Sequence, residues 1–87
     1  MEVVRHKQFV KQMKKLPLSL RKQVLERTIL HSENPSYPLL HDHKLNPPFD
    51  GYRSINITGD YRLVYKKLDA ETYYLRAIGT HHELYGS

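Results

Sequence analysis

The spacing of apolar residues predicts two helices in the first part of the chain. Within residues 6–16, apolar side chains recur at helical spacing with lysines between them: Phe9, Met13 and Leu16. Pro17 interrupts this run because proline lacks a backbone donor. A second helical run starts near Ser19, whose hydroxyl suits a helix N-terminus, and continues through Leu20, Val24, Thr28 and Ile29. The first helix is expected to be amphipathic and basic, and the second to pack antiparallel to it.

The later part of the chain has an apolar period of two, which is typical of strands. Three strands are predicted, over residues 52–57, 61–68 and 72–79, with Gly or Asp in the turns between them. Residues 1–5 are expected to form another strand, because they contain two adjacent β-branched valines. The pattern therefore predicts an α+β fold in which two N-terminal antiparallel helices pack on one face of a small, mainly antiparallel twisted sheet.

A polar segment separates the helices from the three late strands. Residues 34–38, NPSYP, end the second helix, because a residue that precedes proline is pushed out of the helical region. Residues 41–51, HDHKLNPPFDG, then form a proline-bearing loop, and loops of this length are often functional.

Length and composition limit what the fold can do. We expect residues 1–87 to form a single domain, and a domain of this size buries only about 60% of its unfolded surface, so its active site should be shallow. The chain has no cysteine, which excludes disulfides, thiolate zinc sites and a cysteine nucleophile. No apolar run approaches the roughly 20 residues of a membrane span, and the N-terminus lacks a signal-peptide core. The expected location is the cytoplasm, without a membrane partner.

The charge balance favours a polyanionic partner. Fourteen Lys and Arg residues against nine Asp and Glu residues give a formal net charge of +5 and a pI near 9.6. Mildly basic small proteins are common, so charge alone does not identify nucleic acid as that partner.

Six histidines provide acid-base groups that titrate near neutrality. Two of them, His6 and His31, fall in the predicted helices and are expected at the surface. The others form two clusters, one in the loop and one directly after the last strand: His41 and His43, and His81 and His82. With Asp42 between the loop histidines, a metal centre is one alternative, but the spacing matches no closed metal motif. The sequence therefore predicts no metal and no other cofactor.

Together with arginine, these histidines suit RNA cleavage without a metal. That reaction needs a base for the 2′-hydroxyl, a cation for the phosphorane and an acid for the 5′-oxygen. Three arginines lie in predicted strands, where a guanidinium is held rigidly for phosphate: Arg53, Arg62 and Arg76. The alternative is that they pair with nearby carboxylates such as Asp50, Asp60 or Glu71. Tyr85 could stack on a splayed base.

Four segments carry a family resemblance over nearly the whole chain: DHKL, GYRSINI, GDYRLVYKKLD and IGTHHELYG. Their order and spacing resemble the RelE superfamily of bacterial toxin ribonucleases, and most closely its YafQ branch. The resemblance implies the toxin of a type II toxin-antitoxin system, an endoribonuclease that cleaves messenger RNA in the ribosomal A site. It also implies contact with ribosomal RNA and neutralisation by a cognate antitoxin protein.

The resemblance also assigns residues to roles. The catalytic set that it implies is His43, Asp60, Arg62, His81 and Tyr85. His43, Asp60 and His81 match the YafQ pattern, Arg62 matches a phosphate-binding arginine of RelE, and Tyr85 stands at an aromatic position of both branches. Further RNA contacts are expected from Lys44, Arg53, His41 and His82.

Two positions depart from the YafQ pattern. Where that branch carries an aspartate and a histidine after GYR, this chain has Ser54 and Asn56, neither of which is a strong base near neutrality. Which of the remaining groups is the base and which the acid stays open. A basic RNA- or ribosome-binding protein with little or no cleavage activity is the alternative, and a metal-dependent enzyme is a third.

Overall fold

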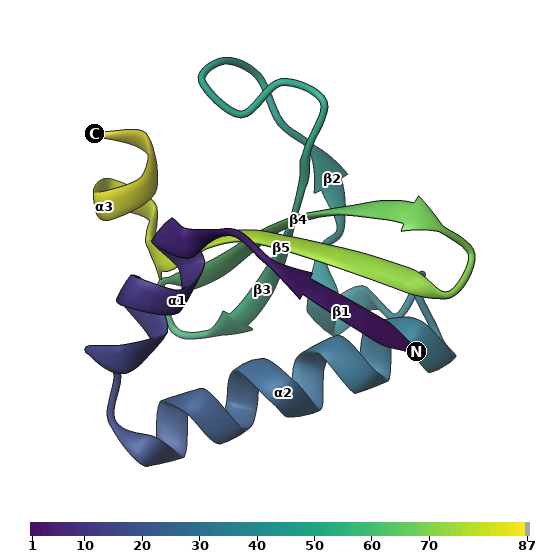
Figure 1. Ribbon diagram of the computed structural model, residues 1–87, viewed down its shortest axis with the longest axis horizontal. Helices are drawn as coiled ribbons and strands as arrows, with labels where there is room; N and C mark the ends of the chain where they lie inside the picture. Colours follow the sequence, from purple (N-terminus) through teal and green to yellow (C-terminus); the bar gives the residue numbers. More distant parts are fainter. Residues whose placement is uncertain (87) are drawn as a thin grey trace.

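A computed structural model describes residues 1–86 and contains a five-stranded sheet with two longer helices on one of its faces (Figure 1). The strands lie in the order β1-β5-β4-β3-β2, where β1 is Glu2–Arg5, β2 is His43–Lys44, β3 is Arg53–Thr58, β4 is Tyr61–Asp69 and β5 is Thr72–Thr80. β1 runs parallel to β5, and every other pair is antiparallel. The predicted fold class is confirmed.

Both longer helices contribute to one apolar core. They are α1 (Lys7–Lys14) and α2 (Leu18–Glu33), and they pack on the side chains that alternate strand residues direct to one face of the sheet. The buried side chains of this core include Phe9, Leu20, Val24, Ile55, Leu63, Tyr65, Tyr73 and Leu75. Within residues 1–86, no helix is long and apolar enough to cross a membrane.

His31 corrects one expectation from the sequence. It was expected at the surface, yet only 4% of it is exposed, whereas Ile29 is 41% exposed. The buried stripe of α2 continues from Val24 through Thr28 to His31, positions four and three residues apart on one helix face. A histidine at such a position needs polar partners, which are described below.

Three short elements were not predicted: β2, the 3₁₀ helix η1 (Pro38–Leu40) and the helix α3 (His81–Tyr85). β2 interrupts the segment predicted as loop, residues 41–51, η1 directly precedes that segment, and α3 follows β5 without a gap. A capping box starts α3, since the Thr80 hydroxyl accepts from the Glu83 backbone N–H at 3.2 Å while Glu83 Oε1 accepts from the Thr80 N–H at 2.8 Å. Gly86 ends it in the left-handed conformation, with φ of 74°.

Removal of the Thr80 hydroxyl should weaken this last helix. Thr80→Ala leaves the Glu83 N–H without its acceptor, so we expect the free energy of unfolding to fall by about 1 kcal/mol. Urea titration followed by circular dichroism measures the difference. Thr80→Ser keeps the hydroxyl and should lie close to wild type, and equal losses for both substitutions would contradict the capping role.

Candidate active site

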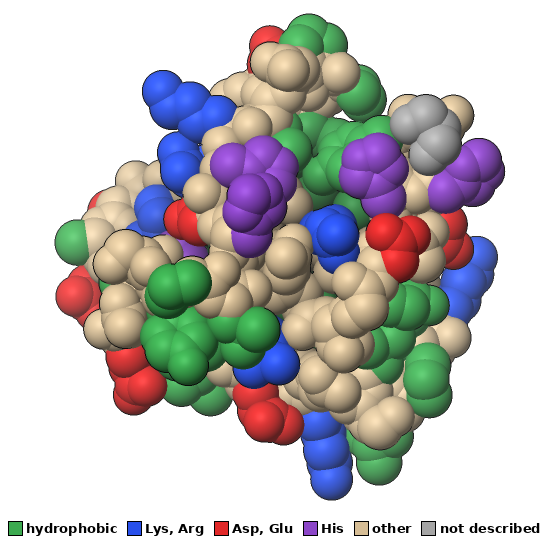
Figure 2. Space-filling view, turned by 180° about the vertical axis from the view of Figure 1, so that it is seen from behind, with side chains coloured by type: hydrophobic (Ala, Val, Ile, Leu, Met, Phe, Trp, Pro, Cys, Tyr) green, Lys and Arg blue, Asp and Glu red, His purple; other side chains and the backbone are tan. Residues whose placement is uncertain are grey.

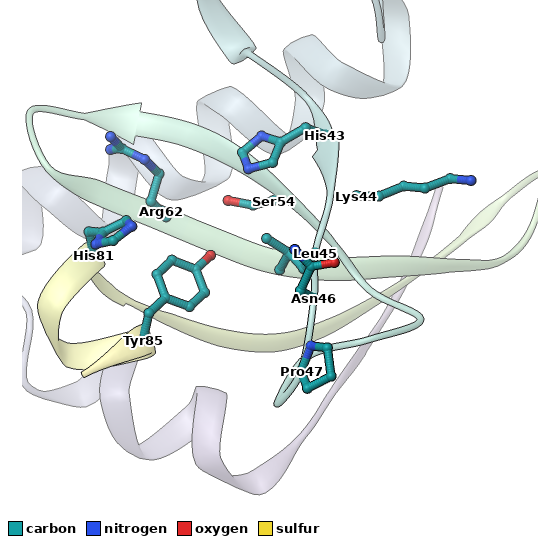
Figure 3. A pocket seen from close by; sticks show the side chains of 9 residues that line it. All are labelled: His43, Lys44, Leu45, Asn46, Pro47, Ser54, Arg62, His81 and Tyr85. Atoms are coloured by element: carbon teal, nitrogen blue, oxygen red, sulfur yellow. The ribbon is translucent and has the colours of Figure 1, made fainter. Parts of the chain in front are cut away.

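A hollow of about 300 Å³ lies where the loop, the sheet and α3 meet (Figure 3). Its lining comes from four parts of the chain: His43, Lys44, Leu45, Asn46 and Pro47 from β2 and the loop, Ser54 from β3, Arg62 from β4, and His81 and Tyr85 from α3. Because Ile55 and Leu63 point to the helices, their neighbours Ser54 and Arg62 point to the opposite face. Seen from behind the view of Figure 1, two groups of histidines flank a cationic side chain on this face (Figure 2).

A second apolar cluster holds the walls of the hollow in place. Phe49 of the loop, Leu84 of α3 and the strand residues Val64 and Ala77 are buried together. Leu45, Tyr52 and Tyr85 pack against them. The loop and the C-terminal helix are thereby fixed to the same face of the sheet, which brings residues from 43 to 85 into one site.

The ring of His43 is held in a defined orientation. Its Nδ1 lies 2.9 Å from the backbone oxygen of His41, and a carbonyl only accepts, so Nδ1 carries the hydrogen. In the neutral ring Nε2 is then the unprotonated nitrogen, which is the form that accepts a proton. His43 is directly opposite Ser54 in the β2–β3 ladder, which sets it over the hollow.

Arg62 is the cation within the hollow. Its Nη1 donates to the backbone oxygens of Gly59 and Tyr61, both at 3.1 Å, and 22% of its side chain is exposed. Asp60 lies in the adjacent turn, with Oδ1 4.0 Å from Arg62 Nη2. Since the carbonyls fix the guanidinium before any ligand arrives, its charge is preorganised for an anion.

His81 and Tyr85 are one turn apart on α3, and their ring centroids are 4.7 Å apart in an edge-to-face arrangement. The other side of Tyr85 faces Phe49, at 6.0 Å between centroids. The Tyr85 hydroxyl points into the hollow (Figure 3), and within residues 1–86 neither it nor the buried hydroxyl of Ser54 has a hydrogen-bond partner. Because both hydroxyl oxygens are buried and unpartnered, they could bond to a polar ligand in the hollow once the side chains adjust.

Part of the predicted site lies together in the hollow. His43, Lys44, Arg62, His81 and Tyr85 line the hollow, although Lys44 points away from its centre (Figure 3). The other predicted residues are outside the lining: Asp60, Arg53, His41 and His82. Ser54 lines the hollow and was noted in the sequence only as a departure from the family pattern. Its position directly opposite His43 depends on β2, a strand too short to recognise from the sequence.

Arg53 pairs with a carboxylate that the sequence did not indicate. Its Nε donates to Asp42 Oδ1 at 2.9 Å, whereas Asp50, Asp60 and Glu71 were the expected candidates. Asp42 Oδ2 also accepts from Tyr65 at 2.8 Å and from His31 Nε2 at 2.9 Å. Because three donors engage this carboxylate, it is not open to a metal, and no group of three possible metal-ligating His, Asp or Glu side chains occurs among residues 1–86.

The hydrogen bonds to Asp42 predict how the free energy of unfolding depends on acidic pH. Burial alone would raise the pKa of Asp42, but hydrogen bonds from His31, Tyr65 and Arg53 outweigh burial and hold that pKa below its ordinary value. A lowered pKa in the folded state contributes stability above the unfolded pKa of about 3.9, and this contribution is lost as the pH falls through the folded value.

We therefore expect Asp42→Asn to cost about 1–3 kcal/mol of unfolding free energy near neutral pH. The difference from wild type should shrink as the pH falls from about 5 to below 3, because both proteins then lack the charge. Urea titrations across this range measure it. A difference that stays constant with pH would contradict an ionised Asp42 in the folded protein.

One family model and several solved structures are similar to this chain. The YafQ toxin family, described as a bacterial toxin of type II toxin-antitoxin systems, matches residues 1–86. The crystal structure of YafQ from E. coli strain BL21(DE3) is 25% identical, with a TM-score of 0.76 over 98% of both chains. A chain of the E. coli DinJ-YafQ complex is 26% identical, with a TM-score of 0.72 over 98% of both. A metal-bound toxin from Helicobacter pylori is 28% identical, with a TM-score of 0.70 over 98% of this chain and 99% of that one. A search of curated proteins found no match.

Proposed function

The chain belongs to the YafQ family of type II toxin-antitoxin toxins, and we propose that it is a ribosome-dependent endoribonuclease that cleaves translated messenger RNA without a metal. The observation that carries the proposal is the hollow itself, in which His43, Arg62 and His81 come together from β2, β4 and α3. These are a proton acceptor, a cation and a second acid-base group, the three kinds of group that the reaction needs.

The chemistry follows from the orientation of each group. His43 Nε2 takes the proton of the 2′-hydroxyl, whose oxygen attacks the adjacent phosphorus. Arg62 stabilises the charge of the phosphorane. The bond from phosphorus to the 5′-oxygen breaks as His81, in its protonated form, donates a proton to that oxygen. The products are a 2′,3′-cyclic phosphate and a free 5′-hydroxyl, and His43 and His81 have exchanged protonation states.

His43 acts as the base because its Nδ1 donates to the His41 backbone oxygen, which leaves Nε2 unprotonated in the neutral ring. His81 is then the acid, since it lies in the same hollow on a separate element. Among the described residues the Ser54 and Tyr85 hydroxyls have no hydrogen-bond partner and can donate to phosphate oxygens, and the Tyr85 ring supports a flanking base. Asp60 acts through Arg62, Arg53 acts through Asp42, and Lys44 and His41 add positive charge or hydrogen-bond donors around the site.

The expected macromolecular partners are messenger RNA in the A site, ribosomal RNA and a cognate antitoxin. Structures of relatives include the E. coli DinJ-YafQ complex and a YoeB-YefM toxin-antitoxin heterotetramer from Staphylococcus aureus. With a net charge of +5, this chain suits an antitoxin segment that is acidic where it meets the toxin. Coexpression of such an antitoxin should relieve the growth arrest that the toxin causes.

The test is to map RNA ends on ribosomes that are programmed with a defined message. We expect cuts confined to the A-site codon, with 2′,3′-cyclic phosphate ends. Free message of the same sequence, with and without chelator, separates ribosome dependence from metal dependence. Ribosome binding without cuts would favour the non-cleaving binder, and loss of cleavage of free RNA on chelation would favour a metal enzyme.

A further inference from the structure

A group of buried polar side chains lies beneath the segment that carries His43. We propose that Asp42, held by His31, Tyr65 and Arg53, is a positioning residue that fixes the orientation of His43. The role in catalysis rests on the proposed ribonuclease function, whereas the orientation of the His43 ring is a property of the free protein.

Side chains from three secondary-structure elements meet at the Asp42 carboxylate. Oδ1 accepts from Arg53 Nε of β3 at 2.9 Å, and Oδ2 accepts from the Tyr65 hydroxyl of β4 at 2.8 Å and from His31 Nε2 of α2 at 2.9 Å. His31 Nδ1 is in turn 2.6 Å from the Tyr73 hydroxyl of β5. The Asp42 carboxylate is thus hydrogen-bonded to α2, β3 and β4, and through His31 it is linked to β5.

The hydrogens of this group can be assigned without leaving a donor or acceptor unmatched. The carboxylate only accepts, so His31 Nε2 and the Tyr65 hydroxyl both donate to it, and the hydrogen on His31 Nε2 is shared with the Tyr65 hydroxyl oxygen 2.8 Å away. In neutral His31, Nδ1 is then an acceptor, and the Tyr73 hydroxyl donates to it. His31, Tyr65 and Tyr73 are each at most 4% exposed, and the Asp42 side chain is 15% exposed. Because water scarcely reaches these bonds, the orientation that they impose on Asp42 is firm.

Leu40, which is fully buried, and Leu45, which packs on the second apolar cluster, anchor the two ends of the segment around Asp42, with little regular structure between them. β2 contains only two residues, His43 and Lys44, and lies at the sheet edge with a single neighbouring strand. His41 is in the left-handed region, with φ of 46°, which is an uncommon conformation for a residue other than glycine. A short edge strand and an unfavourable backbone conformation need a contact from elsewhere, and the Asp42 side chain supplies it.

Asp42 lies in the chain between His41 and His43, whose hydrogen bond orients the His43 ring. The backbone oxygen of His41 accepts from His43 Nδ1, so the backbone of residue 42 determines the distance between the partners. The Asp42 side chain points inward, whereas His41 and His43 are exposed and their ring centroids lie 4.9 Å apart. Loss of the Asp42 contacts would release the His41 oxygen from His43, and with it the preference for hydrogen on Nδ1. A small displacement of a general base costs about 10²-fold in rate.

Nitrogen NMR of the histidine rings tests the positioning directly, without RNA. In wild-type protein labelled with ¹⁵N, with the His43 signals assigned by their loss in His43→Gln, we expect neutral His43 to carry its hydrogen on Nδ1. Asp42→Asn puts an amide where three donors converge, and it should convert His43 to a mixture of tautomers. Asp50→Asn is the matched control, because Asp50 is exposed in the same loop and should leave the tautomer unchanged.

A rate measurement on programmed ribosomes then links the tautomer to cleavage. Asp42→Asn should lower the single-turnover rate about 10²-fold while ribosome binding stays within about twofold of wild type. If Asp42→Asn fails to fold by circular dichroism, Tyr65→Phe, which removes one donor to Asp42, replaces it and should shift the tautomer in the same direction.

The outcomes separate the two proposals. An unchanged His43 tautomer in a folded Asp42→Asn protein overturns the positioning role, whatever the cleavage rate. A changed tautomer in a protein whose wild type never cuts RNA supports the positioning of His43 and overturns the ribonuclease function. A changed tautomer together with a slower cut supports both.

Discussion

His81→Ala should lower the rate of A-site cleavage by about 10²–10⁴-fold, the usual contribution of one general acid or base. The expectation follows from its place in the hollow with His43 and Arg62 and from its proposed role as donor to the 5′-oxygen. Single-turnover cleavage of a defined message on ribosomes measures the rate. His82→Ala is the matched control, since His82 is the exposed neighbour on α3 and lies outside the hollow lining.

A modified message distinguishes an acid from a base at this position. If the 5′-oxygen at the cut is replaced by sulfur, the leaving group no longer needs a proton, so His81→Ala should regain most of its rate. His43→Ala should stay slow on the same message, because the 2′-hydroxyl still needs a base. Recovery by His43→Ala instead of His81→Ala would reverse the two roles, and a His81→Ala protein as fast as wild type on ordinary message would remove His81 from the mechanism.

The fold was predictable from the sequence because its principal elements are long enough to display a period. Three late strands with alternating residues and two helical runs account for most of the sheet and core, and the family resemblance seen in the sequence is confirmed by the match over residues 1–86. β2 and α3 were missed because two and five residues carry no measurable period. His31 was misjudged because burial of a polar side chain depends on partners far away in the chain.

The site was predictable only in part for the same physical reason. His43, Arg62 and His81 came from motif order, and the structure places all three in one hollow. The pairing of Arg53 with Asp42 requires the loop to fold back beside β3, and three carboxylates nearer in sequence to predicted strand arginines looked equally suitable. Charge type along the chain therefore indicated which groups were present, but long-range contacts determined which of them face the hollow and which hold the loop.

Arg62→Ala should lower the cleavage rate by about 10²–10³-fold, the cost of losing one preorganised donor to an oxyanion. In the proposed mechanism Arg62 acts on the phosphorane, and only 22% of its side chain is exposed, so its loss should affect the transition state more than ribosome binding. Arg62→Lys keeps the charge but not the forked donors, and its rate should lie between those of wild type and Arg62→Ala.

Single-turnover rates and ribosome cosedimentation of the same proteins separate these effects. Arg5→Ala is the matched control, because Arg5 is an exposed strand arginine on β1, outside the hollow lining. If Arg62→Ala loses ribosome binding in proportion to cleavage, the arginine serves docking and the phosphorane must be stabilised by another group. If only the rate falls, we expect the Ser54 and Tyr85 hydroxyls to support the residual cleavage, since both belong to residues that line the hollow and have no hydrogen-bond partner among the described residues.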